Sequence, residues 1–164
     1  MSYYWVYRRI DEALLSAARD EAPARGWATF LALAVDGAIP QGGAEAELPG
    51  SAPDRLEPAL LRVADASRIG AEGARATEII GAALRGDGSH VSTAMDTGYG
   101  TPCVLTASRV RAIAEVLRAL KPDDLADALE PELHEHRLPQ LLAWRDLYLA
   151  AARHDQPVVV TPTG

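Results

Sequence analysis

Between residues 98 and 120 the apolar and polar positions follow one another as a turn, a strand and a helix. Gly98 and Gly100 allow the backbone a tight turn, and Pro102 holds the residue before it in an extended conformation. The apolar run Cys103–Leu105 that comes next predicts a short strand. We therefore expect a strand here that leads directly into a helix.

The helix after this strand carries a start signal and an apolar face. Thr106 predicts the N-cap, because its hydroxyl can accept a hydrogen bond from a backbone N–H of the first turn. Leu105 and Val110 are spaced to form a hydrophobic staple across the cap. Apolar residues then recur three or four positions apart up to Leu120, with charged residues between them. This spacing predicts an amphipathic helix.

Two further segments, at opposite ends of the chain, predict strands. Tyr3–Arg9 is rich in aromatic and branched residues on both faces, and Val158–Val160 is entirely apolar. None of the three predicted strands can satisfy its backbone hydrogen bonds alone. We therefore expect them to share one sheet, with helices over most of both faces.

Helical spacing of apolar residues accounts for most of the remaining chain, whereas one stretch has no period. Residues 36–53 combine Gly, Pro, Ala and Glu without periodicity and predict a flexible loop. Together these elements predict a single α+β domain over residues 1–164, in which a small mixed sheet of three to four strands packs with five to six helices. Besides the stretch after Thr106, helical spacing runs through Asp11–Arg19, Thr29–Val35, Pro53–Ala66, Ala71–Leu84, Pro122–Leu129 and Pro139–His154.

Composition limits the partners and the compartment. The 164 residues carry a formal net charge of −7, so nucleic acid would be repelled. The single cysteine, Cys103, excludes an internal disulfide and favours a reducing compartment. No apolar run is long enough to cross a bilayer, and the N-terminal pattern is not that of a signal peptide. We expect a cytoplasmic protein that binds neither nucleic acid nor membrane.

A group of metal-ligand residue types lies between two prolines. Glu132, His134, Glu135 and His136 are close in sequence, but a third strong ligand at a recognised spacing is missing. The flanking prolines favour a loop. We interpret the segment as a solvated charged loop, against the alternative of a metal site, and assign no metal and no cofactor.

The sequence contains residue types that could serve nucleophilic catalysis, but they do not form a recognised catalytic motif. Cys103 and His90 could pair as nucleophile and base, and Ser89, His90 and Asp96 are the types used in acyl transfer. No Gly-x-Ser-x-Gly elbow is present, and no helix N-terminus or cation in the sequence lowers the pKa of the thiol. We expect Cys103 to be buried and inert, and we assign no catalytic residue.

Small-molecule binding has four weak candidates. Asp96 and Tyr99 are an acid and an aromatic residue presented beside glycines, which suits the wall of a pocket. A pocket that also gathered His90 and Arg145, with perturbed pKa values, would favour a binding site. Packing of Tyr99 within the turn is the alternative.

Three segments resemble the YfbM-like family of small bacterial proteins of unknown function. They are the opening Tyr-Tyr-Trp-Val-Tyr-Arg-Arg-Ile-Asp, the central Gly-Tyr-Gly-Thr-Pro-Cys-Val-Leu-Thr with its helix, and the closing helix and strand from Leu141 to Val160. The segments 36–53 and 78–84 depart from the family's pattern. The resemblance implies an α+β fold, and it assigns no activity and no catalytic residue.

Two functional hypotheses follow from the residues. The first is a non-catalytic protein-binding domain of the interaction or immunity type, because an acidic chain without a catalytic set favours a partner protein with a basic surface. The second is a small enzyme or small-molecule binder with its site near Asp96 and Tyr99. A cleft would favour the second, and a flat surface the first.

Overall fold

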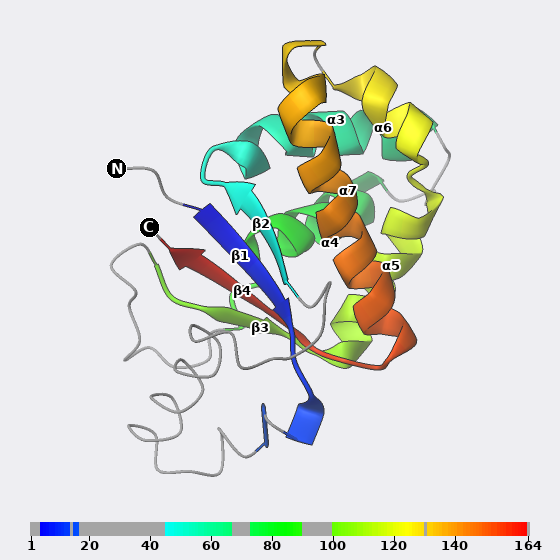
Figure 1. The fold of residues 1–164 in the computed structure, drawn as a ribbon. Helices are drawn as coiled ribbons and strands as arrows, with labels where there is room; N and C mark the ends of the chain where they lie inside the picture. Colours follow the sequence, from blue (N-terminus) through cyan, green and yellow to red (C-terminus); the bar gives the residue numbers. More distant parts are fainter. Residues whose placement is uncertain are drawn as a thin grey trace.

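The structure is a computed structural model that describes residues 4–13, 15–16, 45–66, 73–89, 100–129 and 131–163, with the backbone only at 66, 73, 74 and 131–136. Its elements follow as two strands, two helices, one strand, three helices and a final strand, a grouping expected for an α+β chain (Figure 1). In chain order they are β1 Tyr4–Arg9, β2 Glu45–Pro49, α3 Ala52–Ala66, α4 Gly73–Arg85, β3 Cys103–Leu105, α5 Ala107–Ala119, α6 Pro122–Ala128, α7 Pro131–Arg153 and β4 Val158–Thr163.

The four strands form one sheet in the order β2-β1-β4-β3. The three predicted strands do share this sheet, which confirms that expectation. The predicted mixed sheet is wrong, because all three strand pairs are antiparallel. Two long helices, α5 and α7, separate β3 from β4, so the chain crosses the molecule twice and enters β4 against the direction of β3. A parallel pair would need an odd number of such crossings.

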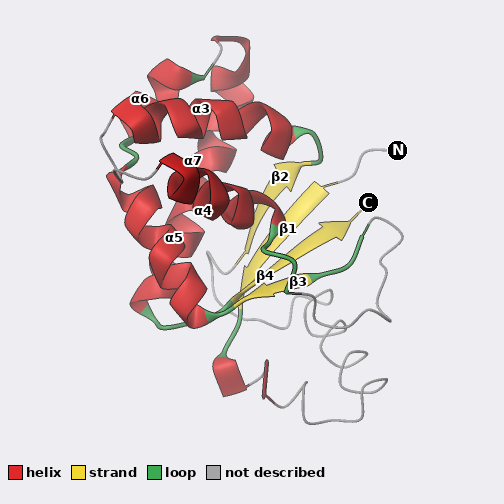
Figure 2. Cartoon of the chain, turned by 180° about the vertical axis from the view of Figure 1, so that it is seen from behind, coloured by secondary structure: helices red, strands yellow, loops and turns green. Residues whose placement is uncertain are grey.

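Helices α3 to α7 all lie on one side of the sheet, where Figures 1 and 2 show them stacked together. We expected helices over most of both faces, and the described helices do not show this. Tyr7, Val160 and Cys103 are cross-strand neighbours on the helix-covered face. On the opposite face Val104 and Val159 are also buried. Both faces of the β1-β4-β3 part are therefore covered, as their apolar sequences predict.

An aromatic cluster joins the sheet to α4 and α7. Trp144 and Tyr148, the predicted aromatic pair of the last helix, meet edge to face with ring centroids 5.4 Å apart. Tyr7 lies edge-on to both rings. The Tyr7 hydroxyl donates to the carbonyl of Leu84 at 2.6 Å, and the Tyr148 hydroxyl donates to that of Ala83 at 2.8 Å. These two tyrosines therefore satisfy carbonyls that the last turn of α4 leaves without helical partners.

Helix α5 begins as its sequence predicts. The Thr106 hydroxyl accepts a hydrogen bond from the Arg109 N–H at 3.3 Å, which makes Thr106 the N-cap. Leu105 and Val110 are both fully buried on either side of this cap, in agreement with the predicted staple.

The loop predicted at 36–53 is wrong where the structure describes it. Glu45–Pro49 is an edge strand paired with β1, and Ala52 already belongs to α3. Ala46 and Leu48 are buried while Glu45 and Glu47 are exposed, which is the alternation of a half-buried strand. Residues 36–44 lie outside the described residues, as does the helix predicted at 29–35.

The charged loop predicted before Pro139 is also wrong. Helix α7 begins at Pro131, and Pro139 lies inside it. Pro131 takes the first helical position, where its missing N–H costs nothing. Pro139 is exposed, so its ring faces away from the core. The other described helices match their predictions; Gly86 ends α4 with φ +84°, and Pro122 begins α6.

Candidate functional site

Three of the four predicted ligand-binding residues, Asp96, Tyr99 and His90, lie outside the described residues. The fourth, Arg145, has a described position on α7. The predicted gathering of these four side chains therefore stays a prediction.

Arg145 holds the end of a neighbouring helix. Its Nε donates to the carbonyl of Leu117 at 2.9 Å, and a terminal nitrogen donates to that of Arg118 at 3.4 Å. The other terminal nitrogen pairs with Asp146 at 3.1 Å. A guanidinium at the C-terminal end of α5 hydrogen-bonds its last carbonyls, of which that of Leu117 also accepts the Leu120 N–H, and opposes the negative end of the helix dipole. These contacts give Arg145 a structural role.

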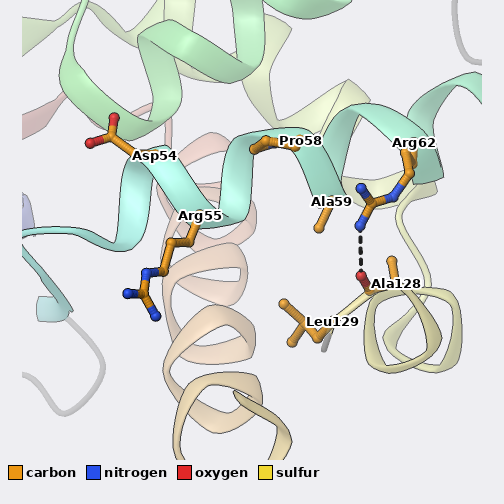
Figure 3. A pocket seen from close by; sticks show the side chains of 7 residues that line it. All are labelled: Asp54, Arg55, Pro58, Ala59, Arg62, Ala128 and Leu129. Atoms are coloured by element: carbon orange, nitrogen blue, oxygen red, sulfur yellow. Dashed lines mark hydrogen bonds between the residues drawn. The ribbon is translucent and has the colours of Figure 1, made fainter. Parts of the chain in front are cut away.

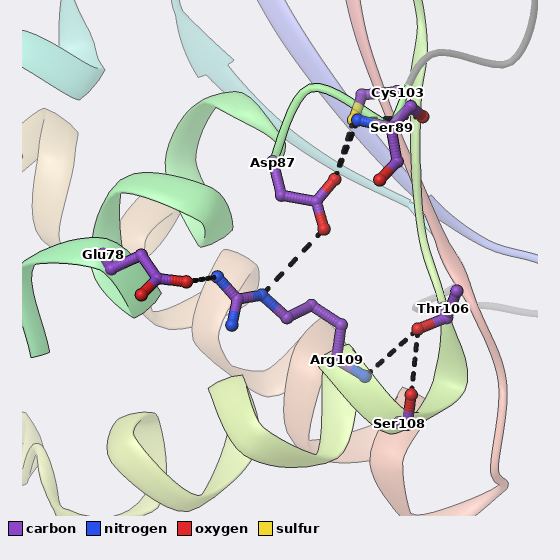
Figure 4. A network of polar contacts seen from close by, with 7 residues as sticks. All are labelled: Glu78, Asp87, Ser89, Cys103, Thr106, Ser108 and Arg109. Atoms are coloured by element: carbon purple, nitrogen blue, oxygen red, sulfur yellow. Dashed lines mark hydrogen bonds and ion pairs between the residues drawn. The ribbon is translucent and has the colours of Figure 1, made fainter. Parts of the chain in front are cut away.

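Cys103 is buried, as expected, and its thiol meets two oxygen acceptors (Figure 4). Its Sγ lies 3.6 Å from Oδ1 of Asp87 and 3.5 Å from the carbonyl oxygen of Ser89. Burial raises the pKa of the Cys103 thiol, and the adjacent Asp87 carboxylate raises it further. The thiol is thus held as a protonated donor, which is opposite to what a nucleophilic cysteine requires.

Asp87 and Arg109 connect the segment after α4 to α5 (Figure 4). Burial opposes ionisation of Asp87, but hydrogen bonds from Ser89 and Cys103 and the charge of Arg109 outweigh it, so the pKa of Asp87 is lowered. The Arg109 guanidinium also donates to Glu78 at 2.7 Å. These ion pairs and hydrogen bonds join α4, the segment after it and α5. We therefore assign the cluster a structural role.

A hollow of about 460 Å³ lies between α3 and α6, and we call it the α3–α6 groove (Figure 3). Arg62 spans it, with a terminal nitrogen donating to the carbonyl of Ala128 at 3.0 Å. Arg55 lies seven residues earlier on the same face of α3, because seven residues make two helical turns. The groove is lined by Asp54, Arg55, Pro58, Ala59, Arg62, Ala128 and Leu129. The sequence reasoning missed this site, whose signal was the Arg55–Arg62 spacing.

The charges on the surface are arranged unequally. In four of the seven ion pairs between described residues, the arginine side chain is 14–35% exposed and its carboxylate partner 41–79%. The four pairs are Arg8–Glu45, Arg85–Asp54, Arg109–Glu78 and Arg145–Asp146. In these four pairs the arginine is partly covered while its carboxylate faces solvent, so each pair presents its negative end outward.

Helix α6 adds three carboxylates to this surface. Asp123, Asp124 and Asp127 are all exposed, and their spacing of three and four residues puts them side by side. Within the described residues none of them forms an ion pair. We call these three residues the α6 acidic face.

Metal and membrane motifs are not found among the described residues. No group of three or more His, Cys, Asp or Glu side chains there could hold a metal ion. No described helix is both long enough and apolar enough to span a membrane.

Comparison with known proteins supports the fold alone. No family model matches the chain, and no curated protein matches it. A solved structure does match: the crystal structure of YfbM, a protein of unknown function from Escherichia coli, with a TM-score of 0.50, 11% sequence identity, and coverage of 99% of this chain and 100% of that one. The chain is therefore an α+β protein with a YfbM-like fold, as the sequence resemblance implied.

Proposed function

We propose that this chain is a non-catalytic, cytoplasmic protein-binding domain whose partner presents a basic surface to the α6 acidic face. The observation that carries the proposal is the placement of charge: in four ion pairs the arginine is partly covered, while its carboxylate remains in solvent. The three acids of α6 are exposed and unpaired within the described residues. An immunity-type or accessory role is consistent with such a surface.

Exposed charges of this kind act mainly on the rate of association. Complementary potentials attract a partner before contact, and this attraction is screened over about 10 Å at 0.1 M ionic strength. Carboxylates that already pair with an arginine, such as Glu78 with Arg109, have their charge partly compensated within the fold. We therefore assign the steering to the α6 acidic face.

The experiment compares two variants that remove the same charge. The first neutralises the α6 acidic face, and the second neutralises three exposed acids on other elements. The variants are Asp123→Asn/Asp124→Asn/Asp127→Asn and the control Glu12→Gln/Glu47→Gln/Glu115→Gln. Each is used, beside the unchanged chain, to recover partners from the native host at low and high salt.

The proposal expects one protein to be recovered by the unchanged chain and the control but much less by the α6 variant. Equal loss with both variants would mean that net charge alone, and no defined face, accounts for binding. Circular dichroism and thermal unfolding of each variant separate lost binding from lost folding.

The other hypothesis, a small enzyme or small-molecule binder near Asp96 and Tyr99, is tested by a metabolite screen run beside the recovery experiment. Turnover that disappears on changing Asp96 or Tyr99, with no stable protein partner recovered, would replace the proposal above.

A further inference from the structure

We propose that the α3–α6 groove binds a small organic oxyanion, a carboxylate or phosphate group attached to an apolar body. This site is distinct from the α6 acidic face, because Ala128 and Leu129 line the groove whereas Asp123, Asp124 and Asp127 do not.

Charged residues lie on two sides of α3, and the side that faces the groove is positive. On the side toward α4, Arg85 pairs with Asp54 and Glu57, each at 2.8 Å. Burial of Arg85 opposes its charge, but the hydrogen bonds that it donates to both carboxylates outweigh this and raise its pKa. The negative charge of Asp54 at the groove's end is thus largely offset. Arg55 and Arg62 are left as the charges that face the groove (Figure 3).

The two arginines differ in how they are held. Arg62 is fixed by its hydrogen bond to the Ala128 carbonyl, which uses one of five N–H donors. Arg55 is exposed and makes no hydrogen bond or ion pair within the described part of the chain. Seven residues along a helix correspond to about 10 Å. The unrestrained side chain of Arg55 can therefore extend along α3 to a ligand that Arg62 holds. A guanidinium presents paired donors that match the oxygens of carboxylate and phosphate.

The rest of the lining is apolar. Ala59 and Leu129 are buried at the base of the groove, and Pro58 and Ala128 complete its wall. A volume of about 460 Å³ suits a small organic molecule, since ligand sites commonly enclose about 300–1,000 Å³. A free inorganic ion would leave this apolar surface in water, so the groove favours an anion that carries a hydrophobic group.

The test titrates the full chain with four probes by isothermal calorimetry: phenyl phosphate, benzoate, inorganic phosphate and benzyl alcohol. Binding of phenyl phosphate or benzoate above both of the other probes is expected, and the stronger of the two identifies the head group. Arg55→Gln and Arg62→Gln should each weaken that binding by roughly tenfold or more, because each removes a charge-assisted hydrogen bond. Arg118→Gln removes an exposed charge from α5 and should leave it unchanged.

Four outcomes overturn the inference. They are no binding of either organic anion, inorganic phosphate binding as tightly as phenyl phosphate, benzyl alcohol binding as tightly as the anions, and equal weakening in all three variants. Arg62→Lys keeps the charge without the paired donors, so an affinity between those of the unchanged chain and Arg62→Gln distinguishes ligand contact from damage to α6 packing. Partner recovery with the α6 variant is measured separately, so either proposal can fail alone.

Discussion

Replacement of Gly86 by alanine should destabilise the fold through one specific contact. Gly86 follows the last residue of α4 with φ +84°, a conformation that side chains other than glycine rarely adopt. A Cβ at this position would lie 2.6 Å from both Cβ and Sγ of Cys103. Cys103 is buried in β3, so its strand would have to move to make room.

The expected magnitude is the sum of two effects. The left-handed conformation costs a residue with a Cβ about 1–2 kcal/mol, and overfilling a packed interior costs about 1–3 kcal/mol more. Gly86→Ala should therefore lower the free energy of unfolding by about 2–5 kcal/mol, which is a large share of the roughly 5–15 kcal/mol that holds an ordinary domain folded.

Gly88 supplies a matched control within the same segment. Its φ is +81°, but nothing lies within 4 Å of where its Cβ would be, so Gly88→Ala should show the conformational cost alone. The two variants should differ by about 1–3 kcal/mol in urea unfolding, and in midpoint temperature by about 2–4 °C for each kcal/mol. Equal destabilisation by the two substitutions would refute the contact between Gly86 and Cys103 and the strand placement that depends on it.

Three further predictions concern single groups. Thr106→Ala should lower the stability of the protein to urea by about 1 kcal/mol through loss of the α5 N-cap, whereas Thr106→Ser should retain it; equal losses would contradict the cap. Cys103 should react slowly with a thiol reagent when native and quickly when unfolded, and rapid native labelling would show that it is accessible. The pKa of Asp87 is lowered in the folded protein, so its ionised form stabilises the fold above the ordinary carboxyl pKa, and this stability is lost as pH falls through the folded value. The free energy of unfolding of Asp87→Asn should therefore fall less than that of the unchanged chain below about pH 4. The same pH dependence in both proteins would contradict this.

Local signals in the sequence were sufficient where neighbouring residues determine the structure. The cap at Thr106 is as predicted, and Leu105 and Val110, the residues expected to form the staple, are both buried beside it. The aromatic pair Trp144 and Tyr148 was likewise visible in its four-residue spacing.

The two errors in secondary structure have physical causes. Glu45–Pro49 has a period of two over only five residues, and the adjacent Gly, Pro and Ala concealed it. Pro139 was taken as a helix start, although an exposed proline can lie within a long helix that other contacts stabilise.

The candidate site could not be predicted because its contacts join distant parts of the chain. Arg145 contacts a helix end 28 residues away, and Arg62 reaches Ala128 across 66 residues. The partners of Cys103 are likewise set by how the segment after α4 lies along β3. Sequence spacing identifies residues that share one helix face, but only the packing of α3 against α6 shows that Arg55 and Arg62 line a groove.

The proposed function is tested most directly by the association rate of the recovered partner, measured against ionic strength for the unchanged chain and both charge variants. If the α6 acidic face steers binding, the unchanged chain and the control should associate more slowly as salt rises. The α6 variant should already be slow at low salt and depend on salt much less. An α6 variant with the same rate and the same salt dependence as the unchanged chain would contradict the proposal.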